Sequence, residues 1–198
     1  MAKKNKLDIA KQIEALEEKI KSSKQELALL RRKAPPTPVE DYLLKDSFGN
    51  SVKLSSLFGE KNELIVVHNM GMSCPSCTTW ADGFNGVLKH LEDRASFVVE
   101  SPETPAKQRQ FAADRGWGFR MVSSKGTTFR HEMGYSDEKN SPWPGVSAFI
   151  KDENGKILRV ADAGFGPGDN FCIVWDFCDL LPGGWKDWDC KHHYSKVR

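Results

Sequence analysis

Two short apolar runs, with a helical segment between them, limit the folds that this chain can adopt. ELIVVHNM (63–70) and SFVVE (96–100) are nearly all apolar, which is typical of strands buried on both faces of a sheet. The stretch between them, 74–94, has apolar residues at helical spacing, and a second helical segment, 105–115, follows. Strands that alternate with helices pair in parallel through right-handed crossovers. The sequence therefore predicts an α/β domain built on a central sheet.

Antiparallel hairpins should extend this sheet and make it mixed. Each predicted hairpin has two strand-like segments flanking a turn-forming stretch. The pairs are 42–44 with 51–54, and 145–151 with 156–161. Residues 169–181 predict a final helix closed by Pro182-Gly183-Gly184. The short segments 117–124 and 127–135 are interpreted as strand or loop.

A long amphipathic helix is predicted before the domain, over residues 5–32. Its apolar residues alternate at spacings of four and three, the pattern of a coiled-coil seam. The seam consists of Ile9, Ile13, Leu16, Ile20, Leu27 and Leu30, with Ser23 as a weak point. Ile at one heptad position and Leu at the other favour two strands in parallel coiled coils. Such a helix must dimerise or lie back on the domain, so a homodimer through it is one expectation.

The domain boundaries follow from this pattern. We expect an N-terminal helix over 1–33, a stiff Pro-rich linker over 34–40, the α/β domain over 41–184 and a tail over 185–198. The 29 basic and 27 acidic residues leave a formal charge of only +2, which gives no reason to expect a nucleic-acid or anionic-membrane surface.

The sequence also suggests where the protein resides. No apolar run approaches the roughly 18–20 residues that span a bilayer, and the charged N-terminus lacks an apolar signal core. A cytoplasmic location is therefore expected. Five cysteines, an odd number, argue against a structural disulfide framework in a reducing compartment.

The motif Cys74-Pro75-Ser76-Cys77 is the strongest chemical signal in the chain. If it opens a helix, Pro75 takes the first helical position, where its missing N–H costs nothing. Cys74 is then the N-cap, where the helix dipole and free amides stabilise a thiolate. Thiolates in such motifs have pKa values of about 3.5–7.5. Cys77 lies about one turn later, where it can resolve a mixed disulfide. The motif therefore predicts a redox dithiol.

Two other interpretations of these cysteines are a zinc site and a pair of inert core thiols. Zinc would need a second ligand pair, and only Cys190 with His192 or His193 could supply it. A zinc knuckle normally holds its ligands in short turns, whereas this motif leads into a long helix. We therefore expect no resident metal and no cofactor. Cys172 and Cys178 are interpreted as small buried hydrophobic residues, and Cys190 as unpaired.

Four other residues are candidates for supporting roles. His68 ends the strand that leads into the motif and could influence Cys74, although a hydrogen-bonded polar residue is the simpler interpretation. Asp82, two helical turns after Cys74, could accept a proton beneath the thiols or lie at the surface. Val146 and Ser147, near the start of the predicted strand 145–151, are candidates only through the family resemblance described next. Trp80 is interpreted as a packing residue.

The sequence resembles the thioredoxin superfamily, and more closely the bacterial family called domain of unknown function 899, described as predicted dithiol–disulfide oxidoreductases. The resemblance rests on LIVVHNM, on CPSC followed by WADGF, and on HLEDRASFVV, RGWGFRMVSS and GVSAFIKDENG. It implies a thioredoxin-like fold with the dithiol at Cys74 and Cys77.

This chain departs from that pattern in two places. Thioredoxins have a cis-proline where the strand facing the dithiol begins, but here that start reads PGVS, with Val146 or Ser147 in its place. In addition, SPET stands where a Ser-Arg-Ala-Pro-like sequence is expected. An anion-contacting arginine is thus missing from that place, and Arg120 is either its substitute or, by the favoured interpretation, a surface residue.

These observations predict a dithiol–disulfide oxidoreductase with Cys74 as attacking thiolate and Cys77 as resolving thiol. Its substrate would be a disulfide-containing protein or a small-molecule thiol. Peroxide reduction ranks lower, because the sequence shows no clear threonine and arginine set around one thiolate. The alternatives from other classes are a non-catalytic interaction module, dimerised by the N-terminal helix, and a structural zinc protein.

Overall fold

The computed structural model describes residues 2–195, with side chains described from Asp8 onward. Residue 1 of the predicted helical region and residues 196–198 of the predicted tail lie outside the described residues. The chain divides into two compact units, Met1–Pro36 and Thr37–Arg198. Each unit is described by itself.

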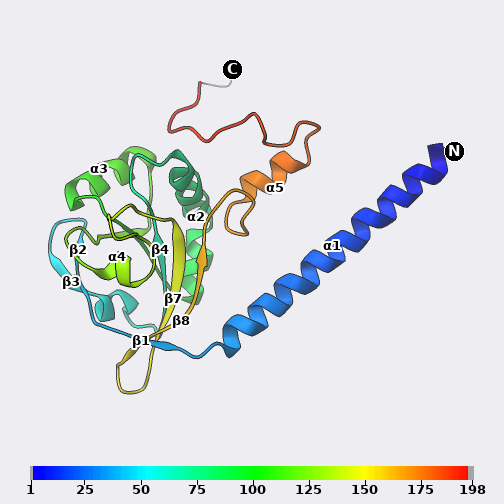
Figure 1. The fold of residues 1–198 in the computed structure, drawn as a ribbon. Helices are drawn as coiled ribbons and strands as arrows, with labels where there is room; N and C mark the ends of the chain where they lie inside the picture. The colour runs from blue at the N-terminus through cyan, green and yellow to red at the C-terminus, as the bar shows by residue number, and fades with distance from the viewer. Residues whose placement is uncertain (1, 196–198) are drawn as a thin grey trace. The chain divides into compact units, whose positions relative to one another are not determined.

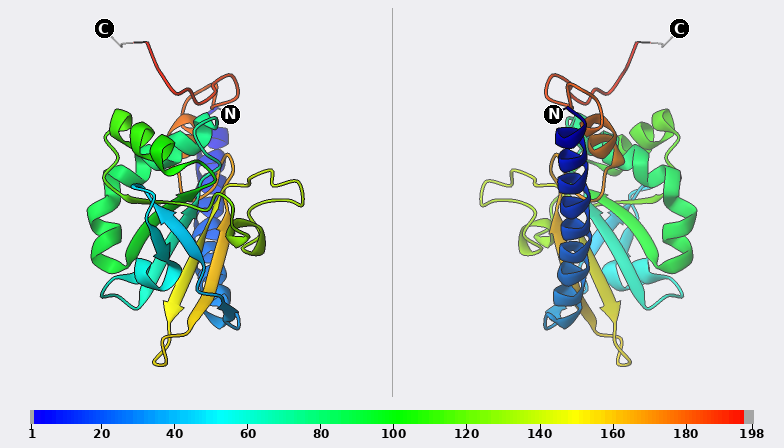
Figure 2. Two further views of the ribbon diagram at one scale, coloured as in Figure 1. Left: turned by 90° about the vertical axis from the view of Figure 1, so that its left-hand side faces the viewer. Right: turned by 90° about the vertical axis from the view of Figure 1, so that its right-hand side faces the viewer.

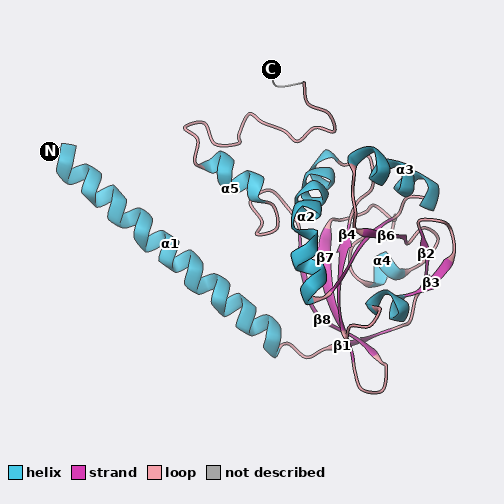
Figure 3. Cartoon of the chain, turned by 180° about the vertical axis from the view of Figure 1, so that it is seen from behind, coloured by secondary structure: helices cyan, strands magenta, loops and turns pink. Residues whose placement is uncertain are grey.

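The first unit is the helix α1 (Ala2–Lys33), which runs without interruption (Figure 3). Its 32 residues span about 48 Å at about 1.5 Å per residue. Three cations, Arg31, Arg32 and Lys33, occupy the last turn, where the helix dipole favours positive charge. The helix predicted from the apolar seam is confirmed.

The second unit is built on one mixed eight-stranded sheet in the order β1-β8-β7-β4-β5-β6-β2-β3 (Figure 1). The central strands β4, β5 and β6 are parallel, and all other neighbours are antiparallel. The strands are β1 (Thr37–Val39), β2 (Leu43–Asp46), β3 (Ser51–Lys53), β4 (Glu63–His68), β5 (Ser96–Ser101), β6 (Arg120–Ser123), β7 (Gly145–Lys151) and β8 (Ile157–Gly164). The predicted α/β fold, with its parallel unit and two hairpins, is confirmed.

Helices cover both faces of this sheet. They are a 3-10 helix η1 (Leu54–Phe58) and the α-helices α2 (Pro75–Arg94), α3 (Pro105–Arg115), α4 (Phe129–Glu132) and α5 (Ile173–Asp179). Alternate residues of β4 enter two separate cores. Leu64 and Val66 pack with residues of η1 and α4, whereas Val67 packs with Trp80 of α2 and residues of α5. In the edge-on views of Figure 2, α2 and α3 lie on one side of the sheet.

The structure differs from the predictions in its short elements. The segment 127–135, interpreted as strand or loop, contains the one-turn helix α4. The segment 34–40, predicted as a linker, contains the edge strand β1, whose three residues pair with β8. Pro38 is compatible with an edge strand, where one side of the backbone needs no partner.

The predicted final helix, 169–181, is too long. Asp169 accepts the backbone N–H of Phe171 on Oδ1 at 2.7 Å and that of Gly166 on Oδ2 at 2.9 Å. Its carboxylate thereby holds a turn, as short acidic side chains often do. The helix α5 consequently begins only at Ile173 and ends at Asp179.

A tight contact at the start of β7 gives a first testable prediction. A Cβ atom on Gly145 would lie 2.1 Å from Cε1 of Tyr135 and 2.6 Å from the backbone oxygen of Ala163. We expect Gly145→Ala to lower the free energy of unfolding by about 1–3 kcal/mol, because an overpacked core must shift to accept the methyl group. Urea denaturation followed by tryptophan fluorescence measures the change.

The matched control is Gly164→Ala. Gly164 is the cross-strand partner of Gly145, but a Cβ there would meet no atom within 4 Å. We expect the control to change stability by less than about 0.5 kcal/mol. Equal effects of the two substitutions would contradict the steric argument.

Candidate functional site

The two cysteines of the motif lie where β4 gives way to α2, at the carboxyl ends of the parallel strands. Cys74 is the N-cap of α2 and Pro75 occupies the first helical position, as the sequence predicts. The preceding turn depends on Gly71, whose φ of +104° is rarely adopted by other residues. A Cβ on Gly71 would also lie only 3.1 Å from Oε1 of Glu103. The backbone therefore turns sharply enough to place Cys74 at the helix terminus.

The Cys74 thiol is half-buried and suited to ionisation. Its Sγ accepts the backbone N–H of Cys77 at 3.1 Å. A hydrogen bond from the Cys77 thiol, with backbone N–H groups of Cys77 and Ser76, outweighs the effect of partial burial and lowers the pKa of Cys74 to about 7. A large fraction of Cys74 is therefore thiolate at neutral pH.

Cys77 has the opposite properties. It is buried at 3% exposure. The Cys77 thiol donates a hydrogen bond to the Cys74 sulfur. This hydrogen bond, together with burial, raises the pKa of Cys77 well above the usual range of a thiol. The two neighbouring cysteines are therefore chemically distinct: one is ready to attack, and the other holds its proton. Both are free thiols in this structure.

A buried cluster of polar side chains lies at the end of β4, next to this motif. His68 has no exposed surface. Its Nδ1 lies 3.0 Å from Oε2 of Glu100 on β5, and its Nε2 lies 3.0 Å from Oγ of Ser147 on β7. The imidazole also stacks on the ring of Tyr135, with centroids 3.9 Å apart. The predicted hydrogen-bonded role of His68 agrees with these contacts.

Glu100 is the centre of this cluster and is also fully buried. Its Oε2 accepts Nη2 of Arg130 at 2.9 Å, and its Oε1 accepts the hydroxyl of Ser124. Burial by itself would raise the pKa of Glu100, but the charge of Arg130 and the hydrogen bonds from His68 and Ser124 outweigh it and lower the pKa. Glu100 is therefore a carboxylate paired with a buried guanidinium.

Asn69 connects the buried cluster to the dithiol. Its backbone oxygen accepts Nη2 of Arg130 at 2.5 Å, and its backbone N–H donates to the oxygen of Glu100 at 2.8 Å. Its side chain donates to the backbone oxygen of Cys77 at 3.3 Å and accepts the N–H of Gly71 at 2.8 Å. The position of the CPSC turn is thus fixed by the same residue that contacts the buried charges.

The strand β7 lies beside β4, the strand that leads into the dithiol. Its first residue, Gly145, pairs with His68, followed by Val146 with Val67 and Ser147 with Val66. No peptide bond in the described part of the chain is cis. Ser147 is buried and directed toward His68, whereas Val146 is partly buried in the core under α2.

Two predicted supporting residues lie away from the dithiol. Asp82 is exposed and accepts Arg115 Nε at 2.9 Å and Trp117 Nε1 at 2.8 Å, so it joins α2 to α3. The structure places it at the surface and not beneath the thiols. Arg120 is exposed at the start of β6. The arginine whose charge acts on Cys77 is Arg130 of α4. The sequence did not reveal it, because a helix of four residues is too short to show a periodic pattern.

The other cysteines and histidines form no second site among the described residues. Cys172 and Cys190 are buried in the core that contains Trp175, and burial raises the pKa of Cys172. Nδ1 of His192 lies 3.4 Å from Oγ1 of Thr78. Among residues 2–195, no three His, Cys, Asp or Glu side chains lie together in a way that could hold a metal ion. The ligand set considered for zinc is therefore not assembled there.

A pocket of about 700 Å³ opens at the same edge of the sheet. It is lined by Pro102 after β5, by residues 124–128 after β6 and by Arg130 and His131 of α4, among others. Ser124 and Arg130 belong both to this pocket and to the buried cluster. Ligands of open α/β sheets bind outside the carboxyl ends of the strands, which is where the pocket and the dithiol lie.

The chain matches the model of the family described as "Bacterial protein of unknown function (DUF899)" over residues 4–197. It belongs to this family. None of the curated proteins matches it. No helix within the described part of the chain is long and apolar enough to cross a membrane.

Solved structures show the same fold. Peroxidoxin BcpB from Mycobacterium tuberculosis has a TM-score of 0.54 at 24% identity, covering 65% of this chain and 84% of its own. Peroxiredoxin Q from Xanthomonas campestris has a TM-score of 0.54 at 21% identity, covering 63% and 80%. The C47S mutant of PrxQ from Xylella fastidiosa has a TM-score of 0.53 at 16% identity, covering 66% and 85%. At these identities the likeness establishes the thioredoxin-like fold.

The buried cluster predicts a pH dependence of stability. Burial lowers the pKa of His68 below its ordinary value of 6.5, against the opposing effect of Glu100. Below pH 6.5 the imidazole of His68 is therefore protonated in the unfolded chain but stays neutral in the folded chain. The free energy of unfolding consequently decreases as the pH is lowered. We expect the free energy of unfolding to decrease between pH 6.5 and 5.0, with His68 contributing up to about 1.4 kcal/mol per pH unit.

Two variants identify the source of this slope in urea denaturation at each pH. His68→Gln should reduce the slope, because the titrating group is removed. His90→Gln, at an exposed position on α2, should retain the slope of the unmodified protein. Identical slopes in all three proteins would show that His68 does not exclude a proton.

Proposed function

We propose that this protein is a thiol–disulfide oxidoreductase that reacts through Cys74 and Cys77. The observation that carries the proposal is the asymmetry of the two thiols. Cys74, at a helix N-terminus, has a pKa of about 7, whereas the buried Cys77 keeps its proton. An attacking thiolate beside a protonated resolving thiol is what two-step disulfide exchange requires.

In the first step, the Cys74 thiolate attacks one sulfur of a substrate disulfide. A bond forms between Cys74 and that sulfur, the substrate S–S bond breaks, and the other substrate sulfur leaves as a thiolate. The attacking group is reactive because its pKa lies near the ambient pH, which is the optimum for such a thiol. Cys74 is only half-buried, so a substrate can reach it.

In the second step, Cys77 attacks the sulfur of Cys74. Once Cys74 is in a mixed disulfide it no longer carries the negative charge that raises the pKa of Cys77. The positive charge of Arg130 acts in the opposite direction and favours the Cys77 thiolate. Cys77 then loses its proton, the second substrate thiolate leaves, and a Cys74–Cys77 disulfide remains. Two electrons have passed to the substrate, and an external dithiol must return them.

We assign the part of a substrate that flanks its sulfur to the pocket after β5 and β6, which shares Ser124 and Arg130 with the buried cluster but is not lined by either cysteine. Its volume of about 700 Å³ lies in the range of about 300–1,000 Å³ that is usual for small-molecule sites. This supports a small-molecule disulfide or thiol, or a short protruding loop of a protein, as substrate. Because electrons move only between pairs of sulfur atoms, the exchange needs no resident cofactor.

Peroxide reduction is a second candidate, favoured by the names of the similar solved structures. The Cys74 thiolate would attack the O–O bond, forming a sulfenic acid and releasing an alcohol or water. The Cys77 thiol would then condense with the sulfenic acid, forming the Cys74–Cys77 disulfide and releasing one water molecule. The same two residues serve both reactions, so the first intermediate distinguishes them.

The ionisation of Cys74 is the first test. We expect its alkylation by iodoacetamide, followed by peptide mass spectrometry between pH 5 and 9, to reach half its maximal rate near pH 7. Cys77 should not be modified at neutral pH, because it is buried and protonated. A midpoint near the ordinary thiol value of about 8.5 would contradict the proposal.

Trapping of the intermediate is the second test. Cys77→Ser treated with oxidised glutathione should release one thiol per chain and retain glutathione on Cys74. The unmodified protein should release two thiols and form the Cys74–Cys77 disulfide. If Cys77→Ser instead reacts with alkyl hydroperoxide much faster than with the disulfide and accumulates a sulfenic acid, peroxide reduction is the better assignment. Cys74→Ser should be inert in both assays, and reactivity there would refute both mechanisms.

A further inference from the structure

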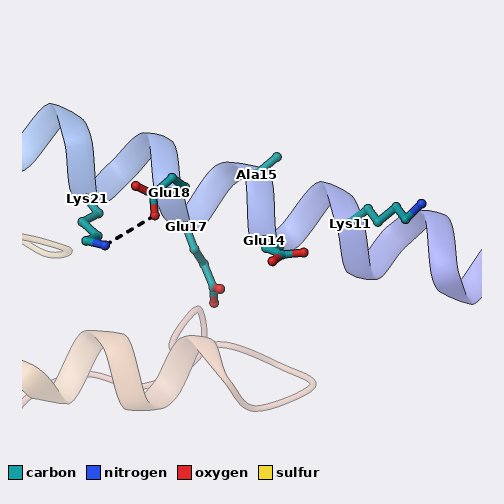
Figure 4. Close-up of a pocket in the computed structure, with 6 residues that line it drawn as sticks. All are labelled: Lys11, Glu14, Ala15, Glu17, Glu18 and Lys21. Carbon is teal, nitrogen blue, oxygen red and sulfur yellow. Dashed lines mark ion pairs between the residues drawn. The ribbon is translucent and has the colours of Figure 1, made fainter.

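The apolar seam of α1 is exposed along the helix and is interrupted only at Ser23. The seam residues are each between 41% and 59% exposed. They are Ile9, Ile13, Leu16, Ile20, Leu27 and Leu30. The charged residues Glu14, Glu18 and Lys21 lie at other heptad positions (Figure 4), with an ion pair of 3.5 Å between Lys21 and Glu18. This division into a seam and a charged face is that of a coiled-coil strand.

We propose that α1 pairs with α1 of a second copy of this chain in an antiparallel two-stranded coiled coil. The core residues alone do not fix the direction of pairing, because either direction buries the same seam. The four charged residues that flank the seam decide it. These are Glu17 and Lys24 at one flanking heptad position, and Lys19 and Glu26 at the other.

In the antiparallel register, Ile20 packs across from Ser23 of the partner subunit. Each flanking position then faces the same heptad position of the other helix. Lys19 faces Glu26 of the partner subunit, and Glu17 faces Lys24 of the partner subunit. Twofold symmetry repeats both pairs, so all four contacts join opposite charges. The remaining flanking positions pair Gln12 with a lysine and Ala10 with an arginine, and neither pairing is repulsive.

The parallel, in-register dimer has less favourable contacts. There the two kinds of flanking position face each other. Lys19 would lie opposite Lys24 of the partner subunit on both sides of the dimer. Only the pair of Glu26 with Arg31 of the partner subunit would be attractive. The weak seam residue Ser23 would also meet a second Ser23, whereas the antiparallel register packs each Ser23 against an isoleucine.

The antiparallel arrangement separates the two copies. Residue 33 of each chain lies at an opposite end of the paired helices, about 35 Å from its counterpart at about 1.5 Å per residue. The Pro-containing segments that follow therefore leave the helix pair in different places. Because α1 contains no cysteine, this pairing is independent of the proposed redox chemistry and can be tested without an activity assay.

The experiment is sedimentation of the full chain at low ionic strength, where exposed charges act most strongly. The unmodified protein should be a dimer. Lys19→Glu with Lys24→Glu turns all four antiparallel contacts into like-charge pairs, and should raise the dissociation constant of the dimer at least tenfold. In a parallel dimer the same change only replaces a Lys–Lys contact by Glu–Glu and should have little effect.

The decisive variant adds Glu17→Lys and Glu26→Lys to these two changes. The four substitutions restore every antiparallel contact with reversed polarity, and should return the dissociation constant to within a few-fold of the original. In a parallel dimer they would place a positive charge at position 26 opposite Arg31 of the partner subunit, and this repulsion would weaken the dimer further. A monomeric unmodified chain, a larger oligomer, or failure of the fourfold variant to recover would each overturn the proposal.

The folding of the second unit provides the control. All six tryptophans lie beyond residue 36, so tryptophan fluorescence reports on that unit alone. The emission spectrum and the pH profile of Cys74 alkylation should be unchanged in every α1 variant. A change in either would show that α1 docks on its own domain and does not pair with a second copy.

Discussion

The burial of one carboxylate, that of Glu100, constrains the whole edge of the sheet on which the dithiol lies. Removing an ion from water costs several kcal/mol even after the protein relaxes, so the carboxylate needs several partners. His68 comes from β4, Ser124 follows β6, and Arg130 comes from α4. Each partner lies on a different element, and all of these elements must therefore be in register for the charge to be tolerated.

The buried cluster and the thiols have separate tasks. The low pKa of Cys74 arises from groups within four residues of it: the Cys77 thiol and the N–H groups at the start of α2. The cluster acts at a distance, by fixing Asn69 and with it the turn that holds both cysteines. Because the reactive group is tuned locally, changes in the cluster should alter where the thiols lie more than how they ionise.

Features that are set by neighbouring residues could be predicted from the sequence, whereas features that depend on contacts between distant residues could not. Cys74, Pro75 and the strand before them carry their signals within a dozen residues, so the helix-start dithiol was predictable. The cluster joins residues far apart in the chain, such as His68 with Glu100, 32 positions apart, and Arg130 with Glu100, 30 positions apart. No spacing rule connects these residues. Arg130 was missed for this reason, because α4 has only four residues and shows no periodicity.

Asp82 shows that a clear local pattern can still leave the environment of a side chain undetermined. Helical spacing placed it two turns after Cys74, but the periodicity of a helix gives only the direction of a side chain relative to its own axis. The neighbours of Asp82 are Arg115 and Trp117, which belong to α3 and the loop after it. An acidic residue that can pair with a guanidinium at the surface avoids the cost of burial. Asp82 therefore lies at the surface, where the packing of α3 brings Arg115 beside it.

The start of β7, next to the strand that leads into the dithiol, shows how the fold can do without a proline at that place. Gly145 pairs with His68 and leaves space for the ring of Tyr135, which stacks on the imidazole. The Tyr135 hydroxyl donates to the backbone oxygen of Val146 at 2.8 Å and so ties the start of β7 to the same ring. Side-chain packing thus sets the backbone where the thioredoxin pattern uses a proline ring. Since Tyr135 and His68 can be there only if position 145 lacks a side chain, the glycine and the buried cluster depend on each other.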